Sequence, residues 1–299
     1  MIYTVTLNPS LDYHLYLTAL SVGNVYRTQH TGITFGGKGI NVSVILSRLG
    51  IPNTALGFVA GFTGDELCAR LTEAGVRQDM IRLENGYTRI NVKLHAADET
   101  EINAAGATVT SDAMEVLLGK LELLNGGDEL VLSGSIPPSL PIAAYGNIMA
   151  RLKSKGVRCV VDAEGDALLA TLPYAPFLIK PNLHELSMLA RERLTTDAEI
   201  ISAARGLQAR GAQNVLISLG ARGAILLDAD GGCHIAPAFV GNPVNTVGAG
   251  DSMVAGFLAG LPEGYESALR MGLAAGCATA FAEGLGEKET ILALYHNRS

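Results

Sequence analysis

The chain has 299 residues, of which 48% are hydrophobic and 17% are charged, and this balance excludes an intrinsically disordered chain. Its net charge of −7 excludes a general attraction to nucleic acid or to an anionic membrane, so a local group of cations and amides must hold any anionic ligand. The four cysteines form no C-x-x-C pair, which argues against a zinc site and a disulfide framework.

The N-terminal segment MIYTVTLNPS has no basic lead followed by an apolar block, so it does not look like a secretory signal. The longest weakly polar run, MGLAAGCATAFA, is about half as long as a membrane-spanning helix. We therefore expect a cytoplasmic protein with neither nucleic-acid nor membrane partners.

Short apolar or β-branched runs alternate with helical patterns along most of the chain. This order predicts an α/β fold with a doubly wound, mostly parallel sheet flanked by helices, whose ligands bind beyond the carboxyl ends of the strands. The strands are expected at residues 2–7, 54–59, 129–134, 157–163, 177–182 and 214–220, and the helices at 40–49, 64–74, 111–124, 141–155, 183–190 and 197–210.

Two stretches, at about 12–35 and 87–104, break this order, and we expect them to form a small inserted β-sheet that acts as a lid. Within TRINVKL, side chains two apart share one face of a strand, which places Arg89, Asn91 and Lys93 together. That face is either an ordinary exposed polar surface or a surface for phosphate and sugar hydroxyls.

The segment FGGKGINVS nearly matches the P-loop motif, but Gly39 stands where a P-loop needs serine or threonine. We therefore reject a P-loop. The glycines precede a helix whose first turn carries Lys38 and Asn41, an arrangement that can direct amides and a cation at an anion. A flexible turn with a solvated lysine is the competing interpretation.

Two later motifs are weak by themselves. In KPNLHEL, Asn182 and Glu185 have the spacing of a helix capping box, although a carboxylate there could also help to place hydrated magnesium. In SLGARG, Ser218, Gly220 and Gly223 follow a strand at the expected ligand edge, where an ordinary turn is equally consistent.

The segment NTVGAGDSMVAGF places Asp251 in or just before the first turn of a helix. Gly248, Ala249 and Gly250 leave the helix amides open to a large anion, which the helix dipole also favours. The competing interpretation is that Asp251 only caps the helix. No G-x-G-x-x-G, H-E-x-x-H or G-x-S-x-G occurs, which argues against a Rossmann dehydrogenase, a zincin and an α/β-hydrolase.

Taken in order, TVTLNPSLD, GGKGINVS, TRINVKL, TEINAAG, LSGSIPP, KPNLHEL, SLGARGA and VNTVGAGDSMVAGF resemble the ribokinase-like (PfkB) carbohydrate kinases. The resemblance covers essentially the whole chain and is strongest to the 1-phosphofructokinases, with tagatose-6-phosphate kinases next. It implies a single ribokinase-like domain over 1–299, with lid strands at about 12–35 and 87–104. Val44, Ser139 and Glu164 depart from the usual 1-phosphofructokinase pattern.

The resemblance implies phosphoryl transfer from ATP, with Mg²⁺, to the C6 hydroxyl of D-fructose 1-phosphate. Tagatose 6-phosphate is the alternative substrate, and a non-catalytic sugar-phosphate sensor on the same fold is the alternative of another class. By resemblance, Asp251 accepts the hydroxyl proton, and the amides around Gly248, Ala249 and Gly250 stabilise the phosphoryl group. We expect the helix dipole to keep Asp251 ionised at neutral pH.

The resemblance also assigns binding roles. The sugar phosphate is expected to contact Asp12, Arg27, Gly37, Lys38, Asn41, Arg89, Asn91 and Lys93. The nucleotide is expected at Lys180, Ser218, Gly220 and Gly223, and magnesium near Asn182 and Glu185, through water. Many relatives pair through their lids, so a homodimer is expected.

Overall fold

The computed structural model describes residues 1–28, 30–96 and 98–297. Strand β1 (Ile2–Thr6) lies inside a nine-stranded sheet, where Val5 pairs in parallel with Leu56 on one side and Leu132 on the other. The strand order is β13-β12-β11-β10-β9-β8-β1-β4-β5. The other eight strands are β4 (Asn53–Ala60), β5 (Ile81–Leu83), β8 (Glu129–Ser133), β9 (Arg158–Asp162), β10 (Leu178–Ile179), β11 (Asn214–Ser218), β12 (Ala224–Leu227) and β13 (Cys233–Ala236).

All six predicted strands of this sheet are present, and the doubly wound α/β fold is confirmed. Three further strands, β5, β12 and β13, were not predicted. Each has only three or four residues, too few to show a reliable period. β12 runs antiparallel to both β11 and β13, so the end of the sheet departs from the parallel pattern.

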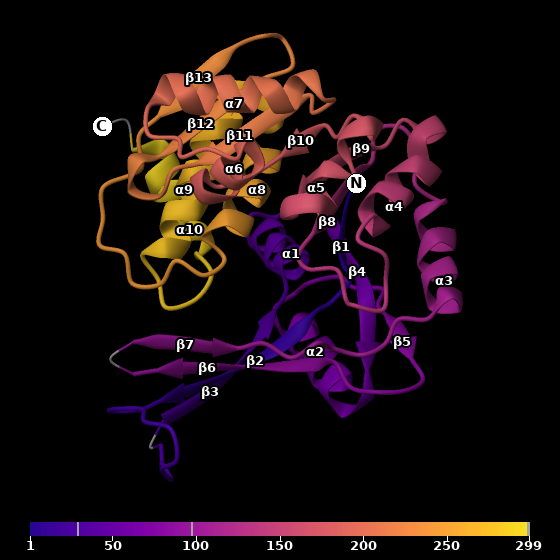
Figure 1. The fold of residues 1–299 in the computed structure, drawn as a ribbon, viewed down its shortest axis with the longest axis vertical. Coiled ribbons are helices and arrows are strands. Elements are labelled where there is room, and N and C mark those ends of the chain that lie inside the picture. The colour runs from indigo at the N-terminus through magenta and orange to yellow at the C-terminus, as the bar shows by residue number, and fades with distance from the viewer. Residues whose placement is uncertain (29, 97, 298–299) are drawn as a thin grey trace.

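Helices cover both faces of the sheet (Figure 1). The side chains of β8 show why, because Leu130 and Leu132 enter one hydrophobic cluster and the intervening Val131 enters another. One face carries α1 (Lys38–Arg48), α2 (Gly61–Glu73), α8 (Ala249–Gly260), α9 (Tyr265–Ala280) and α10 (Lys288–His296). The other carries α3 (Ser111–Leu121), α4 (Ala144–Leu152), α5 (Gly165–Leu169), α6 (Leu183–Ala190) and α7 (Asp197–Ala209).

The weakly polar run near the C-terminus belongs to helix α9, which packs closely against α8. A Cβ atom added to Gly256 of α8 would lie 2.4 Å from the carbonyl oxygen of Met271 in α9, so glycine allows the two backbones to approach. This run is therefore a buried core helix. Across the described residues, no helix combines the length and apolar character needed to cross a bilayer.

The small inserted sheet is also present, and we call it the lid sheet (Figure 1). Its strands, in spatial order, are β3 (His30–Gly36), β2 (Ser10–Tyr16), β6 (Arg89–His95) and β7 (Glu99–Ile102). The two central strands, β2 and β6, are parallel, and each outer strand is antiparallel to its neighbour. Residues 17–28, which were expected within the lid, contain neither helix nor strand.

Candidate active site

A cavity of about 1530 Å³ lies between the lid sheet and the carboxyl edge of the main sheet. Gly134, Asp162, Lys180 and Ser218, which end or follow strands β8 to β11, line it on the main-sheet side. The cavity therefore lies where open α/β sheets bind their ligands. Most of the residues to which a role was assigned from the sequence also line it.

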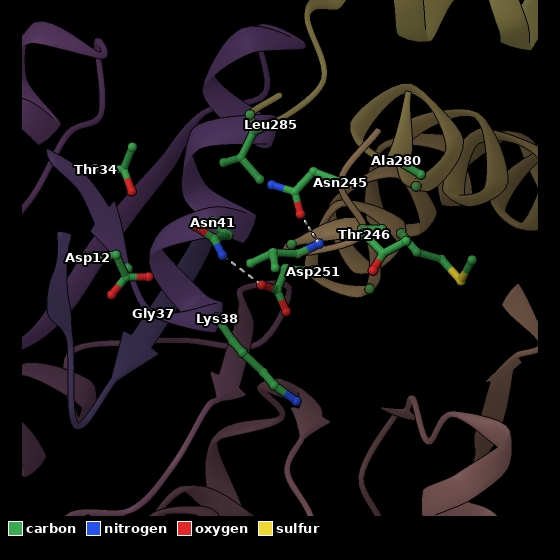
Figure 2. A pocket seen from close by; sticks show the side chains of 18 of the residues that line it. Asp12, Thr34, Gly37, Lys38, Asn41, Asn245, Thr246, Asp251, Ala280 and Leu285 are labelled. Carbon is green, nitrogen blue, oxygen red and sulfur yellow. Dashed lines mark hydrogen bonds between the residues drawn. The ribbon is translucent and has the colours of Figure 1, made fainter. Parts of the chain in front are cut away.

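The first turn of α8 forms the centre of the cavity (Figure 2). Gly248 is the N-cap, and its φ of 80° is a left-handed conformation that favours glycine. The amide of Ala249 donates to the carbonyl of Thr246, at 3.2 Å. Within the described residues, the amides of Gly248, Gly250 and Asp251 have no acceptor, so they are available to an anion in the cavity.

Asp251 is almost completely buried at this helix end, with 5% of its surface exposed. Its Oδ2 accepts a hydrogen bond of 2.8 Å from Nδ2 of Asn41 in α1. Burial raises the pKa of Asp251 to about 7, and the charge of Asp162 adds to this rise. The helix dipole predicts a carboxyl that is fully ionised at neutral pH, whereas with a pKa of about 7 only about half of the population is ionised there. Burial outweighs the dipole, because removing a carboxylate from water disfavours its charged form strongly.

Asp162 is a site residue to which the sequence analysis gave no role. It ends strand β9, is 1% exposed, and pairs with Nζ of Lys38 at 3.2 Å and with Nζ of Lys180 at 3.5 Å. Although burial opposes it, the two ammonium groups lower the pKa of Asp162. Its position, a carboxylate at the carboxyl end of a predicted strand, is the sequence feature that could have pointed to a role in the site.

Lys38 and Lys180 come from different parts of the chain but meet at Asp162. Burial alone would lower the pKa of Lys38, but Asp162, Asp251 and Glu185 outweigh it, so that pKa is raised. A Cβ atom added to Gly250 would lie 3.1 Å from Nζ of Lys180, so this ammonium is next to the α8 tip. Lys180 was assigned to the nucleotide and Lys38 to the sugar, and the structure brings the two together.

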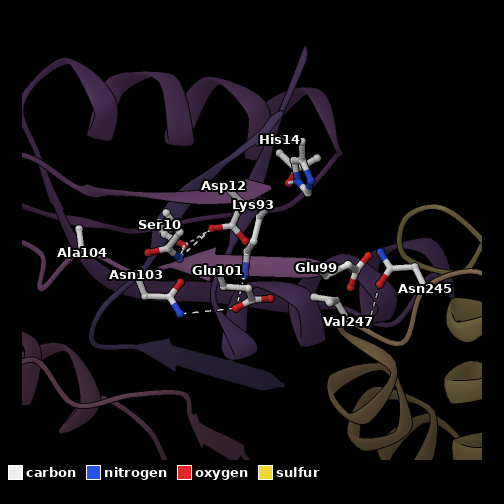
Figure 3. Close-up of polar contacts among 12 residues, drawn as sticks. Ser10, Asp12, His14, Lys93, Glu99, Glu101, Asn103, Ala104, Asn245 and Val247 are labelled. Atoms are coloured by element: carbon white, nitrogen blue, oxygen red, sulfur yellow. Dashed lines mark hydrogen bonds and ion pairs between the residues drawn. The ribbon is translucent and has the colours of Figure 1, made fainter. Parts of the chain in front are cut away.

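The lid face that looks into the cavity is polar (Figure 3). Oδ1 of Asp12 accepts hydrogen bonds from Ser10 Oγ at 2.8 Å and from Asn91 Nδ2 at 2.9 Å. A Cβ atom on Gly36 would lie 2.3 Å from Ser10 Oγ, so only glycine leaves room for this cluster. The cluster fixes the Asp12 carboxylate where it can accept from a ligand.

Two cations extend this polar face. Arg89 Nε donates to the carbonyl of Asn8 at 3.1 Å, and burial lowers the pKa of Arg89. Lys93 is 12% exposed and pairs at 2.7 Å with Glu101, whose pKa this hydrogen bond lowers. Arg89 therefore has no carboxylate partner among the described residues, whereas the charge of Lys93 is balanced.

Two assigned residues do not line the cavity. Arg27 lies exposed in the 17–28 segment and does not line the cavity that Arg89 and Lys93 line. Gly223 has a φ of 96°, and a Cβ atom there would lie 2.0 Å from the carbonyl oxygen of Ala236. Close backbone approach is therefore sufficient to explain this glycine. Both binding roles remain predictions.

The expected nucleotide side contains Ser218 and Gly220, which line the cavity. Asn182 and Glu185 also line it, and they form the capping box that was the competing interpretation. Each side chain accepts from the other residue's amide at 2.8 Å. Within the described ranges, no three His, Cys, Asp or Glu side chains are grouped to hold a metal ion directly.

An irregular segment, residues 238–247, lines the rest of the cavity together with the end of α9. The amides of Val244 and Asn245 both donate to the carbonyl of Ala280, at 2.7 and 3.2 Å, and so tie this segment to α9. No role was predicted from the sequence for residues 238–244 of this wall. It has no periodic pattern, and its position depends on contacts with a helix about 35 residues away along the chain.

Comparison with known proteins identifies the family. The model of the pfkB family of carbohydrate kinases matches residues 5–291. The chain belongs to this family. It is 42% identical, over 97% of this chain and 96% of the relative, to a 1-phosphofructokinase of Bacillus subtilis (strain 168). It is 36% identical, over 96% and 95% respectively, to a D-tagatose-1-phosphate kinase of Bacillus licheniformis.

Among solved structures, phosphofructokinase-2 of Escherichia coli in complex with fructose-6-phosphate is similar, with a TM-score of 0.91 and 30% identity. The match covers 98% of this chain and 97% of that chain. This pfkB kinase is a phosphotransferase with an alcohol group as acceptor. A ribokinase of Arabidopsis thaliana matches 99% of this chain and 98% of its own with a TM-score of 0.82, which confirms the ribokinase-like fold expected from the sequence motifs.

The three departures from the 1-phosphofructokinase pattern have local explanations in this pfkB kinase. Val44 is buried in the cluster between α1 and α2, and Ser139 Oγ accepts from the amide of Val109 at 3.0 Å. Glu164 lies at the cavity, 3.7 Å from Nζ of Lys38. Only Glu164 is therefore placed to affect ligands.

Proposed function

We propose that this pfkB kinase transfers the γ-phosphoryl group of ATP to the C6 hydroxyl of D-fructose 1-phosphate, giving D-fructose 1,6-bisphosphate. The observation that carries the proposal is that one cavity joins the α8 tip at Asp251 to the polar lid face at Arg89. A sugar held there by its phosphate at one end could present its other primary hydroxyl to the helix tip. Similarity to 1-phosphofructokinases favours fructose 1-phosphate as that sugar.

Asp251 is proposed as the general base. Asn41 fixes its Oδ2, and the carboxylate accepts the proton of the C6 hydroxyl as the oxygen attacks the γ-phosphorus. A pKa of about 7 suits this role, because about half of such a carboxylate population is ionised at neutral pH and the group is a stronger base than an exposed aspartate. Burial is what supplies the increased basicity.

The α8 tip is proposed to stabilise the phosphoryl group during its transfer from ATP to the sugar. The amides of Gly248 and Gly250 are free to donate to its oxygens, and the ammonium of Lys180 lies beside Gly250. The oxygens of this group carry negative charge in the transition state, so fixed donors are more useful there than mobile water. Ala249 contributes to the helix dipole, while its amide is directed to Thr246.

The lid face is proposed to bind the substrate's existing phosphate and its hydroxyls. Arg89 would pair with the phosphate, and Asp12 and Asn91 would bond hydroxyl groups. Lys93 would contribute less charge than Arg89, because Glu101 already balances it. Gly37 and Lys38 line the same cavity at the start of α1 and complete the proposed sugar site.

The residues present fit magnesium held mainly through water. Oδ2 of Asp162 is buried and makes no hydrogen bond in the described structure, its ion-pair partner being Nζ of Lys180 at 3.5 Å, and Glu185 and Asn182 line the same cavity. Oxygen ligands of this kind suit Mg²⁺, which usually retains several waters. When bound, Mg²⁺ would neutralise charge on the ATP phosphates. Ser218, Gly220 and Lys180 are the proposed nucleotide contacts.

We also propose a homodimer formed through the lid sheet. The lid face opposite the cavity carries exposed apolar side chains, with Ile90 and Ile102 each more than 40% exposed. A second lid sheet would cover these side chains. A single-chain mass in light scattering, at the concentrations used for activity, would contradict this.

The experiment that tests the function measures ADP release with each candidate sugar phosphate. Fructose 1-phosphate should give the highest kcat/KM among fructose 1-phosphate, fructose 6-phosphate, tagatose 1-phosphate and tagatose 6-phosphate. Tagatose 1-phosphate belongs in the set because this chain is similar to a D-tagatose-1-phosphate kinase. A preference for another sugar phosphate would make that compound the assigned substrate. No turnover with any of the four sugar phosphates would favour the non-catalytic sensor.

A further inference from the structure

Helix α1 contacts the site at both of its ends. Its first turn carries Lys38 and Asn41, which contact Asp162 and Asp251. Its last residue, Arg48, contacts Leu285, Gly286 and Glu287. These belong to residues 283–287, which we call the closing segment and whose members Glu283, Gly284 and Leu285 line the cavity. The second contact has no part in the function proposed above.

Arg48 bonds the closing segment through several atoms. Its Nη1 donates to the carbonyls of Leu285 and Gly286, the latter at 2.9 Å, and its Nη2 pairs with Glu287 at 3.1 Å. The planar guanidinium suits this task, because it can satisfy several oxygens at once, whereas a lysine ammonium acts as a point charge. Arg48 therefore fixes the backbone of the closing segment.

The closing segment in turn contacts the α8 tip. A Cβ atom on Gly248 would lie 2.6 Å from Cδ2 of Leu285, so this side chain packs directly on the N-cap (Figure 2). The amide of Gly286 donates to Thr279 Oγ1 at 2.9 Å, and Thr279 bonds Ser252 Oγ at 2.7 Å. Thr279 and Ser252 are fully buried, so water does not compete for these hydrogen bonds.

We propose that Arg48 is a positioning residue for the nucleoside triphosphate. It holds the closing segment as a wall of the cavity, and through Leu285 and Gly286 it sets the position of the α8 amides that would receive the phosphates. The proposal rests on the proposed function, since it takes ATP as the ligand of this tip. It assigns no contact between Arg48 and the sugar.

The test compares Arg48→Ala, Arg48→Lys and wild type by steady-state kinetics and by calorimetric titration with a non-hydrolysable ATP analogue. For Arg48→Ala we expect KM for ATP and Kd for the analogue to rise about tenfold, equivalent to about 1.4 kcal/mol. KM for fructose 1-phosphate should stay unchanged. Arg48→Lys should recover part of the loss, because an ammonium can still reach one carbonyl.

Two controls separate positioning from general destabilisation. Arg151→Ala removes an arginine that is 51% exposed on α4 and should leave both KM values unchanged. Glu287→Gln removes only the exposed ion pair and should have little effect, since such pairs contribute little. Hydrogen exchange of the unliganded protein should show faster exchange at Gly286 in Arg48→Ala and not in Arg151→Ala.

Failure of this proposal differs from failure of the function. A wild-type protein that neither binds the analogue nor turns over would contradict the proposed function. A wild type that does both, with Arg48→Ala showing an unchanged KM for ATP or an equal rise in both KM values, would overturn the role of Arg48. If Arg48→Ala does not fold, Arg48→Lys is compared with wild type instead. In that variant, an unchanged KM for ATP together with unchanged exchange at Gly286 would overturn the role of Arg48.

Discussion

Asn41 donates a hydrogen bond of 2.8 Å to Asp251, and the two residues are 210 positions apart in the chain. Asn41 is in the first turn of α1 and Asp251 is in the first turn of α8, so the bond joins two helix N-termini at one cavity. Orientation of the proposed base therefore depends on how α1 and α8 pack. Five predictions test this arrangement and the lid face opposite it.

Asp251→Asn should lower kcat by roughly 10²- to 10⁴-fold, the usual contribution of a positioned base. The amide has nearly the same shape but cannot accept the hydroxyl proton. The measurement is kcat by ADP release, with Asp112→Asn as the matched control, because Asp112 is an exposed aspartate in the first turn of α3. Near-normal turnover of Asp251→Asn would remove it from this role.

The value of kcat/KM should rise with pH and level off above a midpoint of about 7. Burial raises the pKa of Asp251 to about 7, and only the ionised carboxylate can accept a proton. The midpoint should be absent from the residual activity of Asp251→Asn. A wild-type midpoint near 4, the ordinary range for aspartate, would show that burial does not control this group.

Two substitutions should move that midpoint in opposite directions. Asp162→Asn removes a negative charge that raises the pKa of Asp251, so the midpoint should move to lower pH. Asn41→Ala removes a hydrogen bond that lowers the same pKa, so the midpoint should move to higher pH. The measurement is the pH profile of kcat/KM for each variant. Shifts in the same direction would contradict the assigned causes.

Asp251→Asn should increase thermal stability at alkaline pH even though it reduces activity. The pKa of Asp251 rises from 3.8 in the unfolded chain to about 7 in the folded protein. The stability this group contributes is therefore present below its unfolded pKa and is lost as pH rises through its folded pKa. The Tm of the variant should exceed that of wild type most at about pH 8, and the excess should shrink toward about pH 5. A pH-independent difference in Tm would argue against this linkage.

Arg89→Ala should chiefly raise KM for the sugar phosphate, because Arg89 is proposed to bind the phosphate in both ground and transition states. KM for ATP should not change. The paired variant Arg82→Ala is a control, since Arg82 is exposed and bonds only Asp65 among the described residues. An unchanged sugar KM in Arg89→Ala would make the lid face an ordinary polar surface.

Several parts of this structure could be read from the sequence, because their signals are local. Alternating side chains placed Arg89, Asn91 and Lys93 on one strand face, and an apolar stripe placed Asp251 at a helix start. The order of strands and helices gave the doubly wound sheet and its ligand edge. Motif spacing also allowed the family to be proposed, and the family comparison confirmed it.

Other features depended on the tertiary structure. The short strands β5, β12 and β13 are too brief to have a period and are defined by their neighbours in the sheet. The wall at residues 238–247 and the contacts of Arg48 join segments that are remote in sequence. Arg27 does not line the cavity in the single chain, although the family resemblance implies a phosphate contact for it.

Asp251, the proposed base, also has some properties that follow from local sequence and others that depend on the tertiary structure. Its position at a helix N-terminus followed from the residues around it, and the dipole predicted an ionised carboxyl. Only the folded chain encloses Asp251 and brings Asp162, Lys38 and Lys180 around it, and that enclosure raises its pKa. Sequence determines which groups a helix end carries, whereas a pKa depends on the water excluded and the charges assembled around the group, which are properties of the whole fold.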